Sequence, residues 1–263
     1  MRLYVEVMRS GFRRYSTYVG ATVAGVFTNT VFGFAKAYIL IAVFAARPML
    51  GGYDIADALT YSFIAQGLIA TVAIWGWFEI HDRIRTGDVA IDLLRPPGFV
   101  AYWLAHDLGR AAYQAVARGV PPFLVAAIVF DLRLPERAET WPLFALSAGL
   151  AVVVAFAMRS IANMAAFWLL DSYGVAGLLS TAWIFLSGLA LPLAVFPAAL
   201  RTFARATPFA MTFDAPAQIF LEQVSGANAG TTLALQAAWA AVLLLAARGV
   251  LDAGTRKLVI QGG

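Results

Sequence analysis

The chain has 263 residues, of which 61% are hydrophobic and 13% charged, with a mean hydropathy of +0.76 and a formal net charge of +4. Soluble domains carry about 45–50% apolar and about 25% charged residues, so this composition indicates a polytopic membrane protein with a single helix bundle. The absence of cysteine excludes disulfides and thiolate metal sites, and the mostly arginine-based positive charge is expected to orient loops rather than to bind nucleic acid.

Residues 1–17 are expected to form an amphipathic interfacial helix. At 100° per residue its apolar side collects Leu3, Tyr4, Val7, Met8, Phe12 and Tyr15, and its polar side Arg2, Glu6, Arg9 and Arg13. Such a helix lies among anionic headgroups, with its apolar side dipping into the acyl boundary. It serves either as a topology anchor alone or as an elbow that also touches a cytoplasmic partner.

Residues 18–263 are expected to form one all-α transmembrane domain with six spans. A helix rises about 1.5 Å per residue, so the apolar stretches are long enough to cross a hydrocarbon core of about 30 Å. The expected spans are residues 18–46, 58–78, 103–130, 141–170, 174–196 and 227–247.

Charged residues inside these spans are the candidates for a polar role within the membrane. Lys36 must snorkel, face a wet cavity or pair with a polar group. Asp107 and Arg110 have the i, i+3 spacing of a pair on one helix face, and Arg159 is the single charge of the fourth span. Such residues are expected to face the bundle interior or a water-filled cavity.

The segment from Pro197 to Gln223 is hydrophobic but too broken to cross the membrane. It is expected to form short half-helices that enter the outer leaflet and return. The residues that define this outer re-entrant segment are Pro197, Arg201, Pro208 and Pro216.

The basic residues predict the orientation of the bundle. Four Lys or Arg residues lie in the N-terminal arm, three in the loop after the second span and three in the tail, whereas five lie in the loops on the opposite side. By the positive-inside rule, both termini are expected to be cytoplasmic.

The loop from Glu79 to Gly98 is the polar stretch that the bilayer does not explain. Glu79 and Arg83 have a favourable i, i+4 order, Gly87 can end a first short helix, and Asp88 can cap a second one that ends before Pro96. Ile91 and Leu94 then form an apolar ridge, while Asp88, Asp92 and Arg95 are expected to remain free for polar docking. From physics alone, a solvated and ordinarily capped loop is the favoured interpretation.

The inventory of reactive groups argues against an enzyme. The chain has two histidines, His81 and His106, and no Gly-x-x-x-x-Gly-Lys-Ser/Thr sequence to cradle a nucleotide phosphate. Any ATPase must therefore be another polypeptide. An ion-coupled secondary transporter is the alternative, because Asp107, Arg110 and Arg159 could form a relay, although no internal repeat is visible.

The stretch RIRTGDVAIDLLRPPG resembles the inner-loop signature of the ABC-2 type permeases, the six-span transmembrane subunits of ATP-binding cassette transporters. Two further stretches are similar to the same family: Leu186–Phe220, and the terminal Arg256-Lys257 followed by Gln261-Gly262-Gly263.

The resemblance implies a permease in a bacterial cytoplasmic membrane, most often an exporter. The apolar, aromatic-rich spans suggest an amphipathic or hydrophobic substrate, although the same residues are also needed to face lipid and to fill the bundle. The resemblance also implies two copies of a separate ATPase, which binds ATP and Mg²⁺, and a second permease, identical or related; this chain itself would bind no cofactor. The second and fifth spans would line the path between the permeases. The residues assigned to the cytoplasmic ATPase-coupling loop are Glu79, Arg83, Arg85, Gly87, Asp88, Ile91, Asp92, Leu94, Arg95 and Pro96.

Overall fold

The computed structural model describes residues 2–96, 98–169 and 172–257, and it is all-α over them. Five stretches of helix are long and apolar enough to cross a membrane, which makes the chain a multi-pass membrane protein. They are α2 (Val19–Ala46), α3 (Ile55–Val72), α6 (Phe99–Gln114) continued through a π-helical turn (Ala115–Gly119) into α7 (Val120–Val129), α8 (Thr140–Met164) with a 3₁₀ turn to Phe167, and α12 (Ala227–Thr255).

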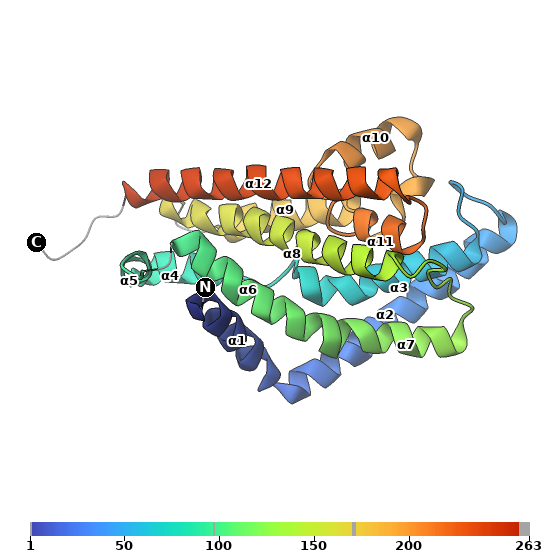
Figure 1. Cartoon of the computed structure of the whole chain (residues 1–263), viewed down its shortest axis with the longest axis horizontal. Helices are drawn as coiled ribbons and strands as arrows, with labels where there is room; N and C mark the ends of the chain where they lie inside the picture. The colour runs from blue at the N-terminus through green and yellow to red at the C-terminus, as the bar shows by residue number, and fades with distance from the viewer. Residues whose placement is uncertain (1, 97, 170–171, 258–263) are drawn as a thin grey trace, which may run out of the picture.

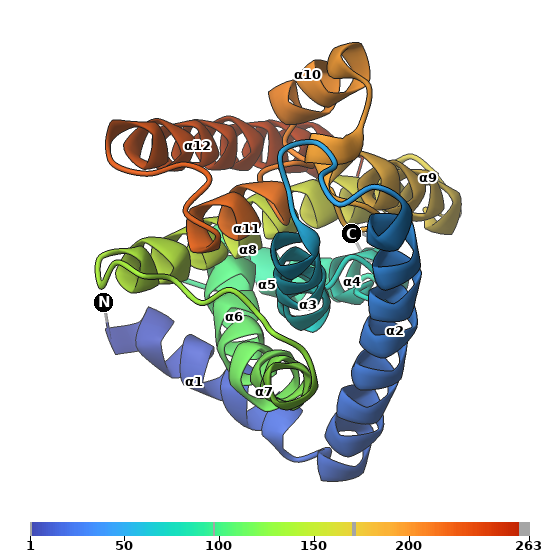
Figure 2. The same cartoon turned by 90° about the vertical axis from the view of Figure 1, so that its right-hand side faces the viewer.

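Helix α3 lies at the centre of the bundle (Figure 2) and is 78% buried over its apolar window, more than any other candidate span. It begins with a capping box, in which the backbone N–H groups of Asp54 and Asp57 donate to each other's carboxylates. It ends at Ala73, which has a left-handed φ of 54°. The helix therefore starts before the expected span 58–78 and stops six residues earlier, and residues 73–78 leave it as an irregular strap.

The expected fifth span, 174–196, is the clearest difference from the sequence prediction. Helix α9 covers only Tyr173–Leu186, which at about 1.5 Å per residue is shorter than a hydrocarbon core. Gly188 then takes a φ of 87°, and a Cβ there would run into the Tyr61 hydroxyl. The chain continues through a 3₁₀ turn (Leu193–Val195), α10 (Ala198–Ala206) and α11 (Asp214–Phe220), each too short to cross.

Helix α1 (Arg2–Ser16) lies along α6 (Figure 1), as an element separate from α2. The two backbones touch at Gly11 and Gly109: a Cβ on Gly11 would overlap the His106 carbonyl, and one on Gly109 would overlap the Met8 carbonyl. Close backbone approach of this kind is the usual role of small residues between membrane helices. Leu3, like much of the remaining apolar side of α1, stays about half exposed.

The two ends of the bundle are formed by different elements of the chain (Figure 1). Helices α4 (Glu79–Thr86) and α5 (Val89–Leu93) lie at one end, together with the C-terminal end of α12. The loops at residues 47–54 and 131–139 lie at the other end. Residue 170 of the expected fourth span and the terminal Gln261-Gly262-Gly263 motif fall outside the described residues.

Substitution Gly109→Ala is expected to destabilise the protein by about 1–3 kcal/mol, because the added methyl group overpacks the contact between α1 and α6. The measurement is thermal unfolding of the purified protein in detergent. Gly149→Ala in α8 is the matched control, since a Cβ there meets no atom within 4 Å; it should be neutral or stabilising. Equal loss of stability in the two variants would contradict this packing.

Candidate functional site

Helices α4 and α5 form a compact hairpin within the loop singled out by the sequence. Gly87 closes α4 with a φ of 82°, as expected for a left-handed C-cap. Asp88 precedes α5 but makes no capping hydrogen bond; its carboxylate instead accepts a hydrogen bond of 3.0 Å from the Thr86 hydroxyl. The predicted cap is therefore wrong, because Asp88 itself has helical backbone angles and its side chain stays beside the turn.

The inner side of the hairpin packs against the membrane helices. Ile80, Ile84 and Val89 are buried in a cluster of apolar side chains. The rest of the cluster comes from α6, α8, α12 and the strap, through Phe99, Val100, Trp103, Phe156, Met164, Ala247, Leu251 and Trp77. The hairpin is thus joined to the bundle by a small core of its own.

Ion pairs inside the hairpin tie its two helices together. Asp92 is 2% exposed and pairs with Arg83, and it also pairs with Arg95 at 3.0 Å. Arg95 in addition lies over the ring of Tyr102 at 4.7 Å. Asp92 is therefore committed within the chain, and the prediction that it remains free for docking is wrong, whereas the side chain of Arg95 keeps 35% of its surface exposed.

Glu79 joins the hairpin to α1 instead of pairing with Arg83. Its carboxylate lies 3.0 Å from the Arg14 guanidinium and accepts a weaker hydrogen bond of 3.4 Å from the Tyr15 hydroxyl. Burial, and next the Glu79 carboxylate, raise the pKa of Tyr15, so its hydroxyl stays protonated and can donate. A partner distant in sequence replaces the local i, i+4 pair.

The outer side of the hairpin remains uncovered. Ile91 is 61% exposed and Leu94 is 85% exposed, although both are apolar. The remaining predicted loop residues on this surface, Arg85, Gly87, Asp88 and Pro96, are also exposed. The predicted apolar ridge is present and has charged neighbours.

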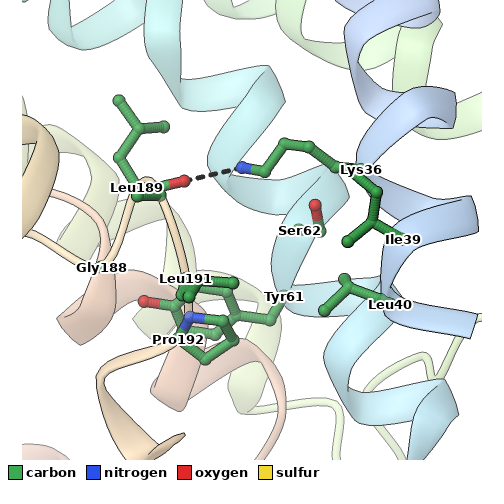
Figure 3. A pocket seen from close by; sticks show the side chains of 10 residues that line it. Lys36, Ile39, Leu40, Tyr61, Ser62, Gly188, Leu189, Leu191 and Pro192 are labelled. Carbon is green, nitrogen blue, oxygen red and sulfur yellow. Dashed lines mark hydrogen bonds between the residues drawn. The ribbon is translucent and has the colours of Figure 1, made fainter. Parts of the chain in front are cut away.

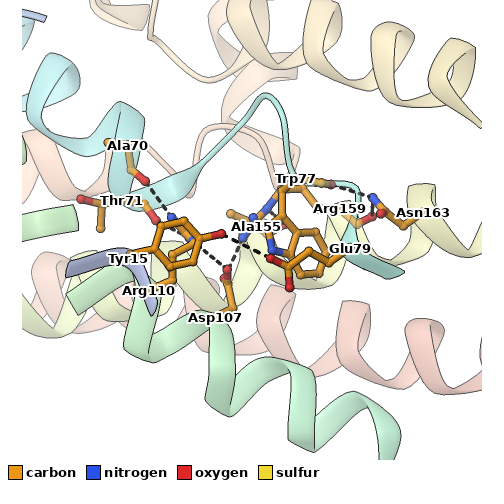
Figure 4. A network of polar contacts seen from close by, with 10 residues as sticks. All are labelled: Tyr15, Ala70, Thr71, Trp77, Glu79, Asp107, Arg110, Ala155, Arg159 and Asn163. Atoms are coloured by element: carbon orange, nitrogen blue, oxygen red, sulfur yellow. Dashed lines mark hydrogen bonds and ion pairs between the residues drawn. The ribbon is translucent and has the colours of Figure 1, made fainter. Parts of the chain in front are cut away.

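A buried charge cluster joins α6 to α8 (Figure 4). Asp107 of α6 is fully buried, and its two carboxylate oxygens lie 2.6 Å from Arg110 and 2.7 Å from Arg159 of α8. Arg110 also donates to the carbonyl oxygens of Ala70 and Thr71, each at 2.8 Å, in the last turn of α3. The predicted Asp107–Arg110 pair is confirmed, and it extends to a third helix.

The strap at residues 73–78 is held by the same cluster. The Arg159 guanidinium lies 4.8 Å from the ring of Trp77, and Asn163, one turn further along α8, donates to the Trp77 carbonyl at 3.1 Å. Asn163 also accepts from the backbone N–H of His81 at 3.1 Å. The start of α4 is thus fixed to α8 by hydrogen bonds.

The segment after α9 has a polar centre of its own. Asp214 is 1% exposed and accepts hydrogen bonds from Tyr61 and Arg205, both at 3.1 Å, and from Gln218. Of the predicted residues, Pro197 precedes α10, Arg201 donates to a carbonyl at 3.1 Å, Pro208 lies in the turn after α10, and Pro216 is buried in α11.

Lys36 ties α2 to this segment (Figure 3). Its ammonium group donates to the carbonyl oxygen of Leu189 at 2.7 Å, beside a cavity of about 90 Å³. Of the three possibilities open from the sequence, pairing with a polar group is the one found.

A protein-family model described as "ABC-2 family transporter protein" matches residues 31–262. The chain belongs to the ABC-2 family of transporter proteins. The matched range includes the α4–α5 hairpin, the charge cluster and the segment after α9, whereas α1 precedes it. The comparison with individual curated proteins gives no match.

Two residues of this ABC-2 protein have structural roles that the sequence did not lead us to expect. Asn163 could have been found, since it follows Arg159 by four residues in an otherwise apolar stretch and so shares its helix face. Arg14 is the one arginine of the N-terminal helix that falls outside its polar side, but the sequence did not indicate its partner, because Glu79 lies far along the chain.

Substitution Asp107→Asn should destabilise the ABC-2 protein by about 3–5 kcal/mol, because two buried arginines lose the carboxylate with which both of them pair. Chemical denaturation in micelles measures the change. The control is Asp131→Asn, on an exposed residue, with an expected change within about 0.5 kcal/mol. An Asp107→Asn variant as stable as the control would show that the cluster contributes little.

Proposed function

We propose that this ABC-2 protein is the permease subunit of an ABC exporter, driven by a separate ATPase that docks on the outer side of the α4–α5 hairpin. The cargo would be an amphipathic or hydrophobic molecule. The observation that carries the proposal is an exposed apolar tip, Ile91 and Leu94, on a hairpin whose inner side is packed into the bundle and whose two helices are ion-paired to each other.

This construction suits a force-transmitting element. An apolar residue exposed as fully as Leu94 is a natural anchor for a pocket on a partner, and polar neighbours such as Asp88 can form the rim of the interface. Since Asn163 and the apolar cluster bind the hairpin to α8, a push on the tip would move the hairpin and the membrane helices together.

The path of the chain favours six crossings, although among the described residues five helices are long and apolar enough to cross. Helix α8 runs toward the hairpin end of the bundle, and α12 starts at the opposite end and also runs toward the hairpin end (Figure 1). The chain must therefore return between Phe167 and Ala227. Helix α9 and the short helices after it would provide this crossing, with α10 and α11 entering the outer leaflet as a re-entrant segment.

With six crossings, both termini and the hairpin lie on one side. The excess of arginine there favours the cytoplasm of a bacterial inner membrane. Helix α1 would then lie in the cytoplasmic interface, close to the docked ATPase through its ion pair with Glu79. ATP and Mg²⁺ would bind the ATPase.

The active assembly would contain two permeases, identical or related, and two ATPases. The sequence-based expectation that the second span lines the path between permeases is revised, because α3 is enclosed within its own subunit. The fifth crossing keeps that role, since Leu178 and Phe185 of α9 are largely exposed.

The geometry of the charge cluster argues against the alternative function, an ion-coupled secondary transporter with Asp107, Arg110 and Arg159 as its relay. Arg110 and Arg159 each occupy one oxygen of Asp107. A carboxylate with both oxygens paired in this way stabilises the packing of the helices and is poorly placed to bind a transported cation.

The docking proposal predicts that Leu94→Asp and Ile91→Asp will each weaken association with the ATPase. A carboxylate at an apolar anchor must be desolvated on binding, so we expect at least a tenfold weaker association. The measurement is co-purification of the P-loop ATPase with the permease and the ATP hydrolysis rate of the complex.

The control variant is Leu134→Asp, which changes a half-exposed leucine at the opposite end of the bundle. It should bind the ATPase as the wild type does. Wild-type association in both hairpin variants would refute docking at this tip.

A further inference from the structure

Arg118 is an arginine within a membrane span that has no hydrogen-bond or ion-pair partner among the residues that the structure describes. It lies in the π-helical turn between α6 and α7. Its Nε atom is buried without an acceptor, and its guanidinium lies against the backbone of α2 at Gly25. Of the other basic residues of the spans, Lys36, Arg110 and Arg159 all donate to oxygen atoms of the chain, and Arg248 is exposed near the C-terminal end of α12.

The unpaired guanidinium borders a cavity of about 250 Å³ near the hairpin end of α3. The cavity is lined by Tyr15, the strap at residues 73–77, Arg110, Gln114 and Arg118, together with residues of the last turn of α3, and none of these described residues carries a carboxylate. Gln114 is 8% exposed, and its side-chain oxygen also lacks a partner. The wall thus holds two incompletely satisfied polar side chains four residues apart.

The charge around the cavity favours an anion. Asp107 pairs with both Arg110 and Arg159, so two arginines share one carboxylate beside the cavity. Arg118 adds a further positive charge without a counter-charge. Placing an unpaired and unhydrated arginine in the apolar part of a membrane costs several kcal/mol of free energy. Binding of an external anion to Arg118 would offset this cost.

The position and size of the cavity indicate which kind of anion fits. Gly25 lies six residues from the start of α2, about 9 Å along the helix, so the guanidinium is at a shallow depth. Trp75 at the cavity wall is 51% exposed, and tryptophan is typical of the headgroup level. Whole small molecules need about 300–1,000 Å³, so this space suits a headgroup with its chains outside.

We propose that this cavity binds the phosphate group of an anionic amphiphile in the leaflet next to the α4–α5 hairpin, with Arg118 as the principal ligand. The guanidinium presents several N–H donors in a plane that matches phosphate oxygens. The site would select anionic over zwitterionic amphiphiles on the side of the membrane from which the exporter loads. The assignment of this side to the cytoplasm, and its role as the loading side of an exporter, rest on the proposed function.

The test titrates the purified full-length chain in detergent with phosphatidylglycerol or phosphatidylcholine of identical acyl chains, and counts retained lipids by native mass spectrometry. The wild type is expected to retain phosphatidylglycerol preferentially. In Arg118→Gln the apparent affinity for phosphatidylglycerol should fall about tenfold or more, and the preference should disappear. Arg118→Lys should restore part of the preference, since it restores the charge without the planar fork.

The matched control is Arg248→Gln, which removes an exposed arginine near the C-terminal end of α12, the end that lies beside the α4–α5 hairpin. It should leave the preference intact. In lipid-free detergent, Arg118→Gln should unfold at the same temperature as the wild type or higher, because it removes an unpaired charge.

Three outcomes would overturn the proposal: an unchanged preference in Arg118→Gln, an equal loss in Arg248→Gln, or displacement of the lipid by millimolar inorganic phosphate, which would assign the cavity to a soluble anion. Because the titration contains no ATPase, its failure would leave docking at the hairpin standing. Failure of docking would equally leave the lipid result standing.

Discussion

The buried carboxylate of Asp107 is the contact on which the arrangement of the other elements depends. It joins α6 to α8 through Arg159, and through Arg110 it reaches the carbonyl oxygens at the end of α3. These carbonyls are left unsatisfied at the end of any helix, and in an apolar surrounding they need a donor. A single acidic residue thereby makes it possible for α3 to stop early inside the bundle.

The early end of α3 determines the course of the chain beyond it. If the helix continued to residue 78, the chain would pass straight into the loop. Instead the strap lies along α8, where Arg159 stacks on Trp77. Asn163 donates to the carbonyl oxygen of Trp77 and accepts from the backbone N–H of His81, so it binds the chain on both sides of the turn into α4. The α4–α5 hairpin therefore begins from a fixed point and gains its own apolar core. In an ABC-2 transporter, such a fixed origin would let a motion at the hairpin reach α3, α6 and α8 together.

Much of this architecture could be predicted from the sequence, because it depends on local pattern. The helix from Val19 to Ala46 follows from a long apolar run, and the Asp107–Arg110 pair follows from its i, i+3 spacing. Gly87 as a C-cap and the exposed ridge of Ile91 and Leu94 follow from turn chemistry and helical periodicity. The matched family range agrees with the resemblance that the loop motif suggested.

The predictions that failed are those in which a distant residue competes with a local one. Glu79 has Arg83 one turn away, but Arg14 from the first helix takes its place, and Arg83 turns to Asp92. The early end of α9 also depends on distant residues. Gly188 lies against the hydroxyl of Tyr61 in α3, and Lys36 of α2 donates a hydrogen bond to the carbonyl oxygen of Leu189. Hydropathy along the chain contains no information on such partners.

Contact between the tip of the α4–α5 hairpin and an ATPase is tested most directly by site-specific cross-linking in the native membrane. The chain has no cysteine, so a single cysteine placed at Leu94 gives an unambiguous probe, and one at Leu134 gives its counterpart at the other end of the bundle. We expect a cross-link from position 94 to a P-loop ATPase, with a yield that changes when ATP binds, and none from position 134. A cross-link to the ATPase from position 134, or its absence from position 94 in a transport-competent complex, would contradict docking at the hairpin.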